Sequence, residues 1–181
     1  MLYYSTNPMY PHYDWSADGK IFRGASIELL EMAAPPGVLL KPLVFPWKRS
    51  LVMADEGSVN LLLSLRITPE RLKFLNFTVH RAFPNPIVIF TRKDNPITFK
   101  TWGDLKKYRG GMSLGDTFGG GFDEYLKREL TIETAADMAV NFKKLELGRI
   151  DYFVSGYYLG IAYLKSNNMA NHKSALKRIR T

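Results

Sequence analysis

Cysteine is absent from the 181 residues, and long apolar runs are absent as well. Without cysteine the chain forms no disulfide and offers no thiol nucleophile or thiolate metal ligand. No uninterrupted apolar stretch reaches the roughly 20 residues that a membrane-spanning helix needs. The chain begins with the strand-like residues 2–6 and not with a charged and then apolar leader, so we expect that an export signal was removed or never present.

Histidine is scarce, which limits the chemistry available to the chain. His12, His80 and His172 lie far apart in the sequence, so they lack the spacing of a zinc site. None of them stands in a recognisable nucleophile-elbow context. Gly115 and the glycines 119–121 miss the spacing of a dinucleotide-binding loop, and no P-loop is present. We therefore expect no enzyme activity, no metal and no cofactor.

Positive charge is in excess, but much of it lies at one end of the chain. The formal net charge is +8. The tail 165–181 contains five basic residues and no acidic one, so the rest of the chain carries only +3. A basic face spread over the whole protein, as nucleic-acid binding requires, is therefore not expected.

Strand-like and helical segments alternate along the chain. Apolar and β-branched runs predict strands, and amphipathic patterns predict helices between them. The predicted strands are 2–6, 38–45, 59–65, 86–92, 112–114 and 150–155, and the helices with clear apolar faces are 25–34 and 47–56. This alternation predicts an α/β fold with mainly parallel sheets flanked by helices.

Capping signals mark two further helices. Thr101 precedes Asp104 by three residues, and Thr134 precedes Asp137 by the same interval, which is the spacing of a capping box. We expect a helix to begin after each threonine. Gly148 stands where the second helix would end, since glycine readily adopts the left-handed conformation that terminates helices.

The segment 63–71 carries the sharpest signal for a binding site. Its apolar run ends at Thr68, which is followed by Pro69 and Arg71, and this predicts a helix capped by Thr68 with an arginine in its first turn. Backbone N–H groups at a helix start and a guanidinium fork together suit a carboxylate. The alternative is a well-capped helix with a solvated arginine.

Several short motifs occur in an order typical of one family. They lie at 9–13, 18–20, 24–30, 46–49, 77–78, 92–97, 102–106 and 147–151. Together with the segment 63–71, they make residues 2–165 resemble the extracellular solute-binding proteins of family 3, which serve polar amino-acid ABC transporters. The resemblance depends on the ordered set, because each motif alone is short.

The resemblance implies the type II periplasmic-binding-protein fold, a two-lobed Venus flytrap that closes over its ligand. Residues 1–84 would form lobe 1, 85–92 the hinge crossing, 93–165 lobe 2 and 166–181 a basic tail. In the family, the chain then returns to lobe 1 through a second crossing. Most of that return would be absent here, so lobe 1 would expose apolar surface and we expect a homodimer that completes it.

The family's ligand positions in lobe 1 match particular residues of this chain. Arg71 matches the arginine that clamps the ligand carboxylate, and Ser64 matches a position whose backbone and hydroxyl assist it. Tyr10 and Trp47 match two aromatic positions that sandwich the ligand side chain. Ordinary core packing is the alternative role for both aromatic residues. Arg66 stands where the family often has serine, and it would add a base to the site.

In lobe 2, one group of residues matches the family's ligand positions and another position differs from them. Asp116 and Thr117 match a strand-to-helix turn whose N–H groups and hydroxyl meet the ligand, and a plain turn is the alternative. The family aspartate that pairs with the ligand α-ammonium corresponds to Gly156, and Asn7 replaces another acid in lobe 1. Since a buried unpaired ammonium is costly, either Asp116 replaces the missing acid or the ligand is not a standard zwitterion. We prefer an anionic or weakly polar ligand. Asp151 is expected to be structural.

The resemblance implies a periplasmic protein that captures an amino acid or a related small carboxylate for an ABC permease. A ligand-sensing or regulatory domain of the same fold, without transport, is the first alternative. A protein without any ligand is the second. A periplasmic dehydratase of the same fold is the third, with Asp116 as its candidate acid. The expected partners are a small-molecule ligand and a permease, and no nucleic acid.

Overall fold

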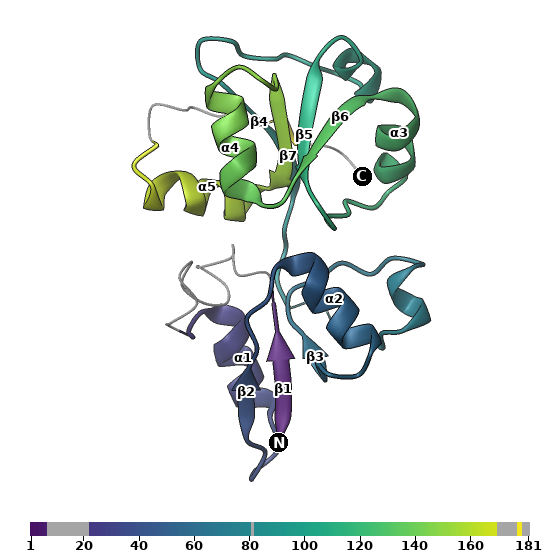
Figure 1. Cartoon of the computed structure of the whole chain (residues 1–181), viewed down its shortest axis with the longest axis vertical. Coiled ribbons are helices and arrows are strands. Elements are labelled where there is room, and N and C mark those ends of the chain that lie inside the picture. Colours follow the sequence, from purple (N-terminus) through teal and green to yellow (C-terminus); the bar gives the residue numbers. More distant parts are fainter. Residues whose placement is uncertain (7–21, 81, 170–176, 179–181) are drawn as a thin grey trace. The chain divides into compact units, whose positions relative to one another are not determined.

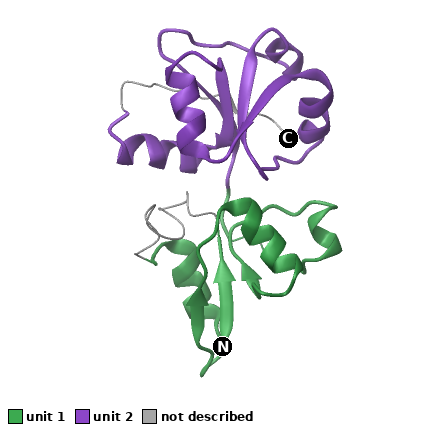
Figure 2. Ribbon diagram, in the orientation of Figure 1, with its two compact units in different colours: residues 1–84 green, residues 85–181 purple. Residues whose placement is uncertain are grey.

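The computed structural model describes residues 1–6, 22–80, 82–169 and 177–178. The chain divides into two compact units, Met1–Pro84 and Asn85–Thr181 (Figure 2). Each unit contains its own sheet with flanking helices, which are labelled in Figure 1. Within the described ranges, no helix combines the length and the apolar character needed to span a bilayer.

Unit 1 is built on a short parallel sheet in the order β2-β1-β3. Its strands are β1 (Leu2–Ser5), β2 (Leu40–Pro42) and β3 (Leu61–Leu62), and its helical segments are α1 (Ala25–Ala33), α2 (Trp47–Asp55) and the 3₁₀ turn η1 (Arg71–Lys73). β1 pairs in parallel with both neighbours, and parallel strands need crossover connections. The two predicted helices, α1 and α2, provide these crossovers.

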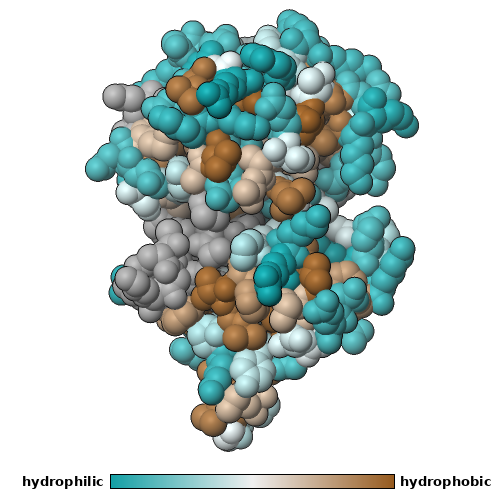
Figure 3. All heavy atoms as spheres, in the orientation of Figure 1, coloured by the Kyte–Doolittle hydropathy of each residue, from teal (hydrophilic) through white to brown (hydrophobic). Residues whose placement is uncertain are grey.

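The apolar core of unit 1 is small. Four apolar side chains are buried among its described residues, whereas 21 are buried in unit 2. Met32 and Val79 remain 84% and 92% exposed, and apolar atoms are visible at the surface in Figure 3. Unit 1 therefore exposes apolar surface, and the homodimer expected from it stays a prediction.

Unit 2 contains a mixed sheet in the order β6-β5-β7-β4-β8. Its strands are β4 (Ile87–Thr91), β5 (Arg109–Ser113), β6 (Thr131–Ala135), β7 (Tyr152–Gly156) and β8 (Lys177–Arg178), and its helical segments are η2 (Trp102–Leu105), α3 (Phe122–Glu129), α4 (Met138–Glu146) and α5 (Tyr157–Ser166). β5 is parallel to β6 and β7, whereas β4 is antiparallel to β7 and β8. The predicted α/β class, with helices flanking parallel strands, is confirmed.

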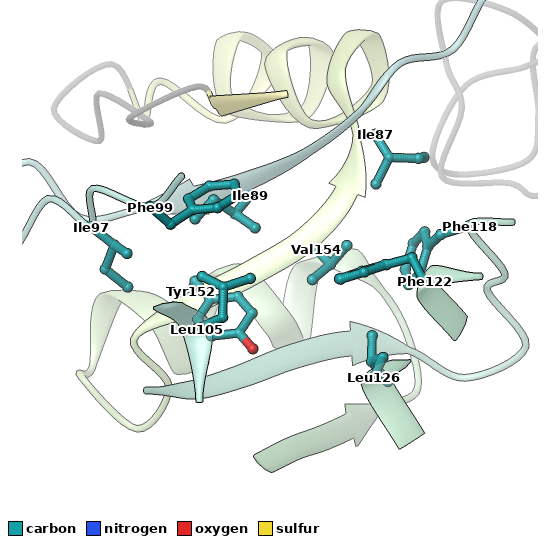
Figure 4. Close-up of a cluster of buried hydrophobic side chains, with 10 residues drawn as sticks. All are labelled: Ile87, Ile89, Ile97, Phe99, Leu105, Phe118, Phe122, Leu126, Tyr152 and Val154. Atoms are coloured by element: carbon teal, nitrogen blue, oxygen red, sulfur yellow. The ribbon is translucent and has the colours of Figure 1, made fainter. Parts of the chain in front are cut away.

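Both faces of the unit 2 sheet are covered by apolar side chains. Alternate residues of a strand point to opposite faces, so Ile89 and Phe90 of β4 enter different parts of the core. Ile89 belongs to the cluster in Figure 4, whose members are Ile87, Ile89, Ile97, Phe99, Leu105, Phe118, Phe122, Leu126, Tyr152 and Val154. Phe90 packs against Phe142 and Phe153, with ring centroids 5.3 and 6.3 Å away. Burial on both faces explains why β4 reads as a continuous apolar run.

One predicted helix start was wrong, because it falls in the strand β6, which was not predicted. Thr134 does not cap a helix, because it lies in β6. The N-cap of α4 is Asp137, whose carboxylate accepts the N–H of Val140 at 2.9 Å. β6 forms an edge of the sheet and mixes exposed polar positions with few apolar ones, so its sequence carried only a weak strand signal.

The other two capping predictions are confirmed. Thr101 and Asp104 form a capping box at the start of η2. The backbone N–H groups of Thr101 and Lys100 donate to the Asp104 carboxylate and hold its pKa below the ordinary value. Gly148 has a φ of 67° after the end of α4 and donates its N–H to the carbonyl of Leu145 at 3.1 Å, as in a glycine C-cap.

Two predicted boundary segments contribute strands to unit 2. The segment 85–92, predicted to be the hinge crossing, contains the buried strand β4. The tail 166–181 contributes β8, which pairs with Val88 and Ile89 of β4. The roles of these segments as connections between lobes stay predictions.

Gly160 provides a test of the packing between α5 and β4. A Cβ at Gly160 would overlap the Phe90 ring, at 2.5 Å from Cε2. Glycine-to-alanine changes in exposed helices stabilise by about 1 kcal/mol, but overpacking costs about 1–3 kcal/mol. We expect Gly160→Ala to lower the free energy of unfolding, measured by chemical denaturation. Gly103→Ala is the control, since its Cβ would meet neighbours at 3.6 Å. A Gly160→Ala protein as stable as wild type would contradict this packing.

Candidate ligand-binding site

The candidate ligand residues of unit 1 follow the carboxyl ends of its three parallel strands. Tyr10 comes after β1, Trp47 comes after β2, and the segment 64–71 comes after β3. Because the strands are parallel, their carboxyl ends meet at one edge of the sheet, and open α/β sheets bind ligands outside this edge. Tyr10 and Asn7 themselves lie outside the described residues.

Arg71 is the central residue of this group. Its side chain is buried, with 6% of the residue exposed, and its Cζ lies 5.6 Å from the centroid of the Trp47 ring. Nη1 donates a hydrogen bond to the carbonyl oxygen of Arg66 at 2.9 Å. A guanidinium held over an aromatic face and by a backbone carbonyl has a defined orientation. The structure therefore brings together three of the predicted positions, with Arg66 contributing its backbone.

The helix expected at Thr68 is only one 3₁₀ turn, which corrects that prediction. Thr68 Oγ1 accepts the N–H of Arg71 at 3.3 Å, as a capping threonine does, but η1 spans only Arg71–Lys73. So short a turn aligns few peptide dipoles, and the macrodipole that would attract an anion is lost. The anion-binding potential of this segment therefore depends on the guanidinium of Arg71.

Ser64 adopts an uncommon backbone conformation next to α1. Its φ is 56°, in the left-handed region that non-glycine residues rarely occupy. Its Oγ lies 2.5 Å from Oγ of Ser26, a buried residue of α1. Ser26 was not predicted, because nothing in the local sequence distinguishes a serine in the first turn of a helix. The hydroxyl of Ser64, a predicted ligand residue, therefore has the hydroxyl of Ser26 beside it.

In unit 2, Asp116 and Thr117 follow β5, whose carboxyl end lies beside those of the parallel strands β6 and β7. Gly115 makes the turn with a φ of 88°, and the N–H of Asp116 donates to the carbonyl of Ser113 at 3.1 Å. Thr117 Oγ1 is buried and has no hydrogen-bond partner in the part of the chain that the structure describes. Since buried hydroxyls are usually satisfied, this oxygen is well suited to bind a ligand.

Asp123 holds the loop between β5 and α3. Its Oδ1 accepts the N–H of Phe118 at 2.9 Å, and its Oδ2 accepts the N–H of Gly119 at 2.8 Å. Gly119 and Gly121 both have positive φ, which glycine adopts without steric cost. These bonds define the path of the chain directly after Thr117. This role of Asp123 was not predicted, although an acid in the first turn of a helix after a glycine loop could have suggested it.

Gly156 and Asp151 lie at opposite ends of β7. Gly156, where the family aspartate would stand, ends β7 and is buried beside the carboxamide of Asn85. Asp151 accepts the N–H of Arg109 at 2.8 Å and donates its own N–H to the Arg109 carbonyl at 2.7 Å. Asp151 therefore joins the starts of β5 and β7 and has a structural role. No group of three or more potential metal ligands clusters within the described residues.

Solved structures with the same fold include amino-acid-binding proteins and a sensor domain. An ancestral arginine-binding protein bound to arginine has a TM-score of 0.79 and 23% identity, covering 98% of this chain and 77% of that chain. A histidine kinase sensor domain with similarity to periplasmic binding proteins has a TM-score of 0.77 and 21% identity, covering 100% and 78%. The substrate-binding protein of an amino acid ABC transporter has a TM-score of 0.75 and 20% identity, covering 98% and 82%.

The chain therefore has the type II periplasmic-binding-protein fold. This confirms the fold that the sequence motifs predicted from their resemblance to solute-binding proteins. By sequence, the chain matches no protein-family profile and no curated protein.

Asp123 allows the loop that carries Thr117 to be tested. We expect Asp123→Ala to lower the free energy of unfolding by about 1–3 kcal/mol, because it leaves two backbone N–H groups without their acceptor. Chemical denaturation measures the effect. Glu124→Ala is the control, since it removes the same charge from an exposed neighbouring position and should change stability by less than about 0.5 kcal/mol. Equal effects of the two changes would argue against the described loop.

Proposed function

We propose that the protein binds a small molecule that bears a carboxylate, such as an amino acid or a related compound. The buried guanidinium of Arg71 over Trp47 carries the proposal. A guanidinium offers parallel N–H donors that match the two oxygens of a carboxylate, and electrostatic attraction is stronger where water is excluded. The fold, shared with proteins that bind amino acids, supports the same ligand class.

The residues proposed to bind the ligand belong to both units. Those of unit 1 suit a carboxylate and an aromatic contact, and those of unit 2 offer hydrogen bonds. The proposed ligand residues are Tyr10, Trp47, Ser64, Arg66, Arg71, Asp116 and Thr117. A ligand that contacts both lobes favours the closed state of a two-lobed protein. Closure would then be the signal that a partner recognises.

We propose transport as the biological role, with a periplasmic location and an ABC permease as partner. The likeness to the substrate-binding protein of an amino acid ABC transporter supports this role. Ligand sensing is the second candidate, because the histidine kinase sensor domain matches the chain over its whole length.

We propose binding without catalysis, since Arg71, Trp47 and Thr117 bind and orient a ligand and supply no general acid or base. A dehydratase-like activity would need Asp116 as its acid.

Arg71 provides the direct test of the proposal. Titration calorimetry and thermal shift of the full chain against amino acids and small carboxylates should identify a ligand for the wild type. At about 100 times Kd, a ligand adds about 2.7 kcal/mol of stability. We expect Arg71→Ala to abolish binding, and Arg71→Lys to weaken it because the bidentate fork is lost.

Arg49→Ala is the matched control for the arginine test. Arg49 also lies over an aromatic ring of unit 1, with its Cζ 5.5 Å from the Phe45 centroid, but it is exposed. We expect Arg49→Ala to bind as the wild type does. Normal ligand binding by a folded Arg71→Ala protein would refute the assignment of the carboxylate clamp.

Thr117 gives a test in which binding and stability change independently. Thr117→Val keeps the shape and removes the hydroxyl, whose oxygen has no partner among the described residues. Folding stability should therefore stay unchanged or rise, whereas ligand binding should weaken by about 0.5–1.5 kcal/mol. Calorimetry and denaturation measure the two effects. Thr134→Val, on an exposed position of β6, should alter neither. A loss of stability without a loss of binding would show that Thr117 is structural.

A further inference from the structure

Ser5 ends β1, and its side chain makes two buried hydrogen bonds to neighbouring segments of unit 1. The residue is 0% exposed. Its Oγ donates to the carbonyl oxygen of Leu43, which follows β2, at 2.7 Å. The same Oγ lies 2.9 Å from Oγ of Ser50, a residue of α2 that is also 0% exposed. One hydroxyl of β1 therefore binds both the loop after β2 and the helix into which this loop leads.

The direction of these two hydrogen bonds follows from the chemistry of the three groups. A carbonyl oxygen only accepts, so the single hydroxyl proton of Ser5 points to Leu43. The oxygen of Ser5 is then the acceptor in the other bond, and the hydroxyl of Ser50 is the donor. Ser5→Ala therefore removes both bonds, whereas Ser50→Ala removes only one of them.

The two hydrogen bonds flank Trp47 along the chain. Leu43 lies four residues before Trp47, and Ser50 lies three residues after it. Trp47 is the first residue of α2, and the N–H of Ser50 donates to the carbonyl of Pro46 at 3.1 Å. Both ends of the segment that contains Trp47 are therefore bound to the end of β1 through one side chain.

The position of Trp47 matters because its ring lies against Arg71. Cζ of Arg71 is 5.6 Å from the ring centroid, and attraction between a cation and an aromatic ring depends on this separation. The backbone of Ser5 also contacts the other side of this pair, since its carbonyl accepts the N–H of Leu63 at 3.0 Å, directly before the segment 64–71. Ser5 thus lies between the two segments that carry the arginine and the ring.

We propose that Ser5 is a positioning residue for the carboxylate clamp of unit 1. Its hydroxyl holds the segment 43–50 on β1 and so sets the place of the Trp47 ring relative to the guanidinium of Arg71. Ser5 has no exposed surface to offer a ligand, so it acts through Trp47. The inference rests on the proposed function for its effect on ligand binding, but its effect on the ring needs no ligand.

Fluorescence of Trp47 tests the inference in the absence of a ligand. The chain has three tryptophans, so a full chain with Trp15→Phe and Trp102→Phe reports on Trp47 alone. In this background we expect Ser5→Ala to raise the acrylamide quenching constant and to shift the emission to longer wavelength, because the ring is no longer held in place. Ser50→Ala should change both signals in the same direction and by less.

Ile27→Val is the control for a loss of stability alone. Ile27 is 2% exposed and belongs to the apolar core of unit 1, so the smaller side chain should lower stability and leave both Trp47 signals unchanged. Circular dichroism shows whether each variant is folded. Unchanged signals in folded Ser5→Ala, or in folded Ser50→Ala where Ser5→Ala does not fold, would overturn the inference. An equal change in Ile27→Val would do the same.

Ligand binding provides the second test. The probes are L-alanine, L-leucine, L-glutamate and succinate, titrated calorimetrically into the full chain. For a probe that binds, Ser5→Ala should raise Kd by at least about threefold, as expected for the loss of a hydrogen bond. The same change should have no further effect in a Trp47→Leu background, because residues that act through one another are not additive. An equal rise in Kd in both backgrounds would contradict a role through Trp47.

The two tests distinguish failure of the inference from failure of the proposed function. Binding that is lost in Arg71→Ala but unchanged in Ser5→Ala and Ser50→Ala would refute the positioning role and leave the proposed function standing. A cooperatively folded wild type that binds none of the probes, or whose binding persists in Arg71→Ala, would count against the proposed function. The fluorescence of Trp47 would still decide whether Ser5 positions the ring.

Discussion

Parallel strand pairing is the constraint on which the candidate site depends. Strands that run in the same direction must be joined by crossovers, and the loops that follow them then meet at one edge of the sheet. In unit 1 this brings Arg71, which follows β3, onto the ring of Trp47, which follows β2. In unit 2 the same rule places the Thr117 turn and the end of β7 at a common edge. Neither arrangement requires the residues to be close in the sequence.

Close approach to glycine is the second organising feature, and it is strongest in unit 2. A Cβ at Gly110 would overlap the ring of Tyr152, and a Cβ at Gly111 would come within 2.8 Å of Asn141 Oδ1. The two adjacent glycines of β5 thus make room for large side chains on opposite faces of the sheet. Gly156 makes room for Asn85 in the same way. Dense packing of this kind lets a neighbour decide which residue is tolerated.

Local sequence patterns predicted most of the helices and strands, because these elements depend on residues close together in the chain. The amphipathic segments 25–34 and 47–56 correspond to α1 and α2, and the capping box at Thr101 forms as expected. The errors have a common cause. β6 lies at a sheet edge and lacks a strong apolar pattern, and the helix expected after Thr68 stops after one 3₁₀ turn. In both places the tertiary surroundings outweighed a weak local preference.

By itself, the sequence determined the α/β alternation, the absence of thiol chemistry and, through its resemblance to a known family, the choice of Arg71 and Thr117 as candidates. Periodicity and capping act over a few residues, so they can be recognised without a structure. Only the tertiary structure decided that the guanidinium of Arg71 lies over Trp47, that the Thr117 hydroxyl is buried, and that Asn85 occupies the space above Gly156. Strand register and side-chain packing create these contacts between distant residues, and no single segment of the chain encodes either of them alone.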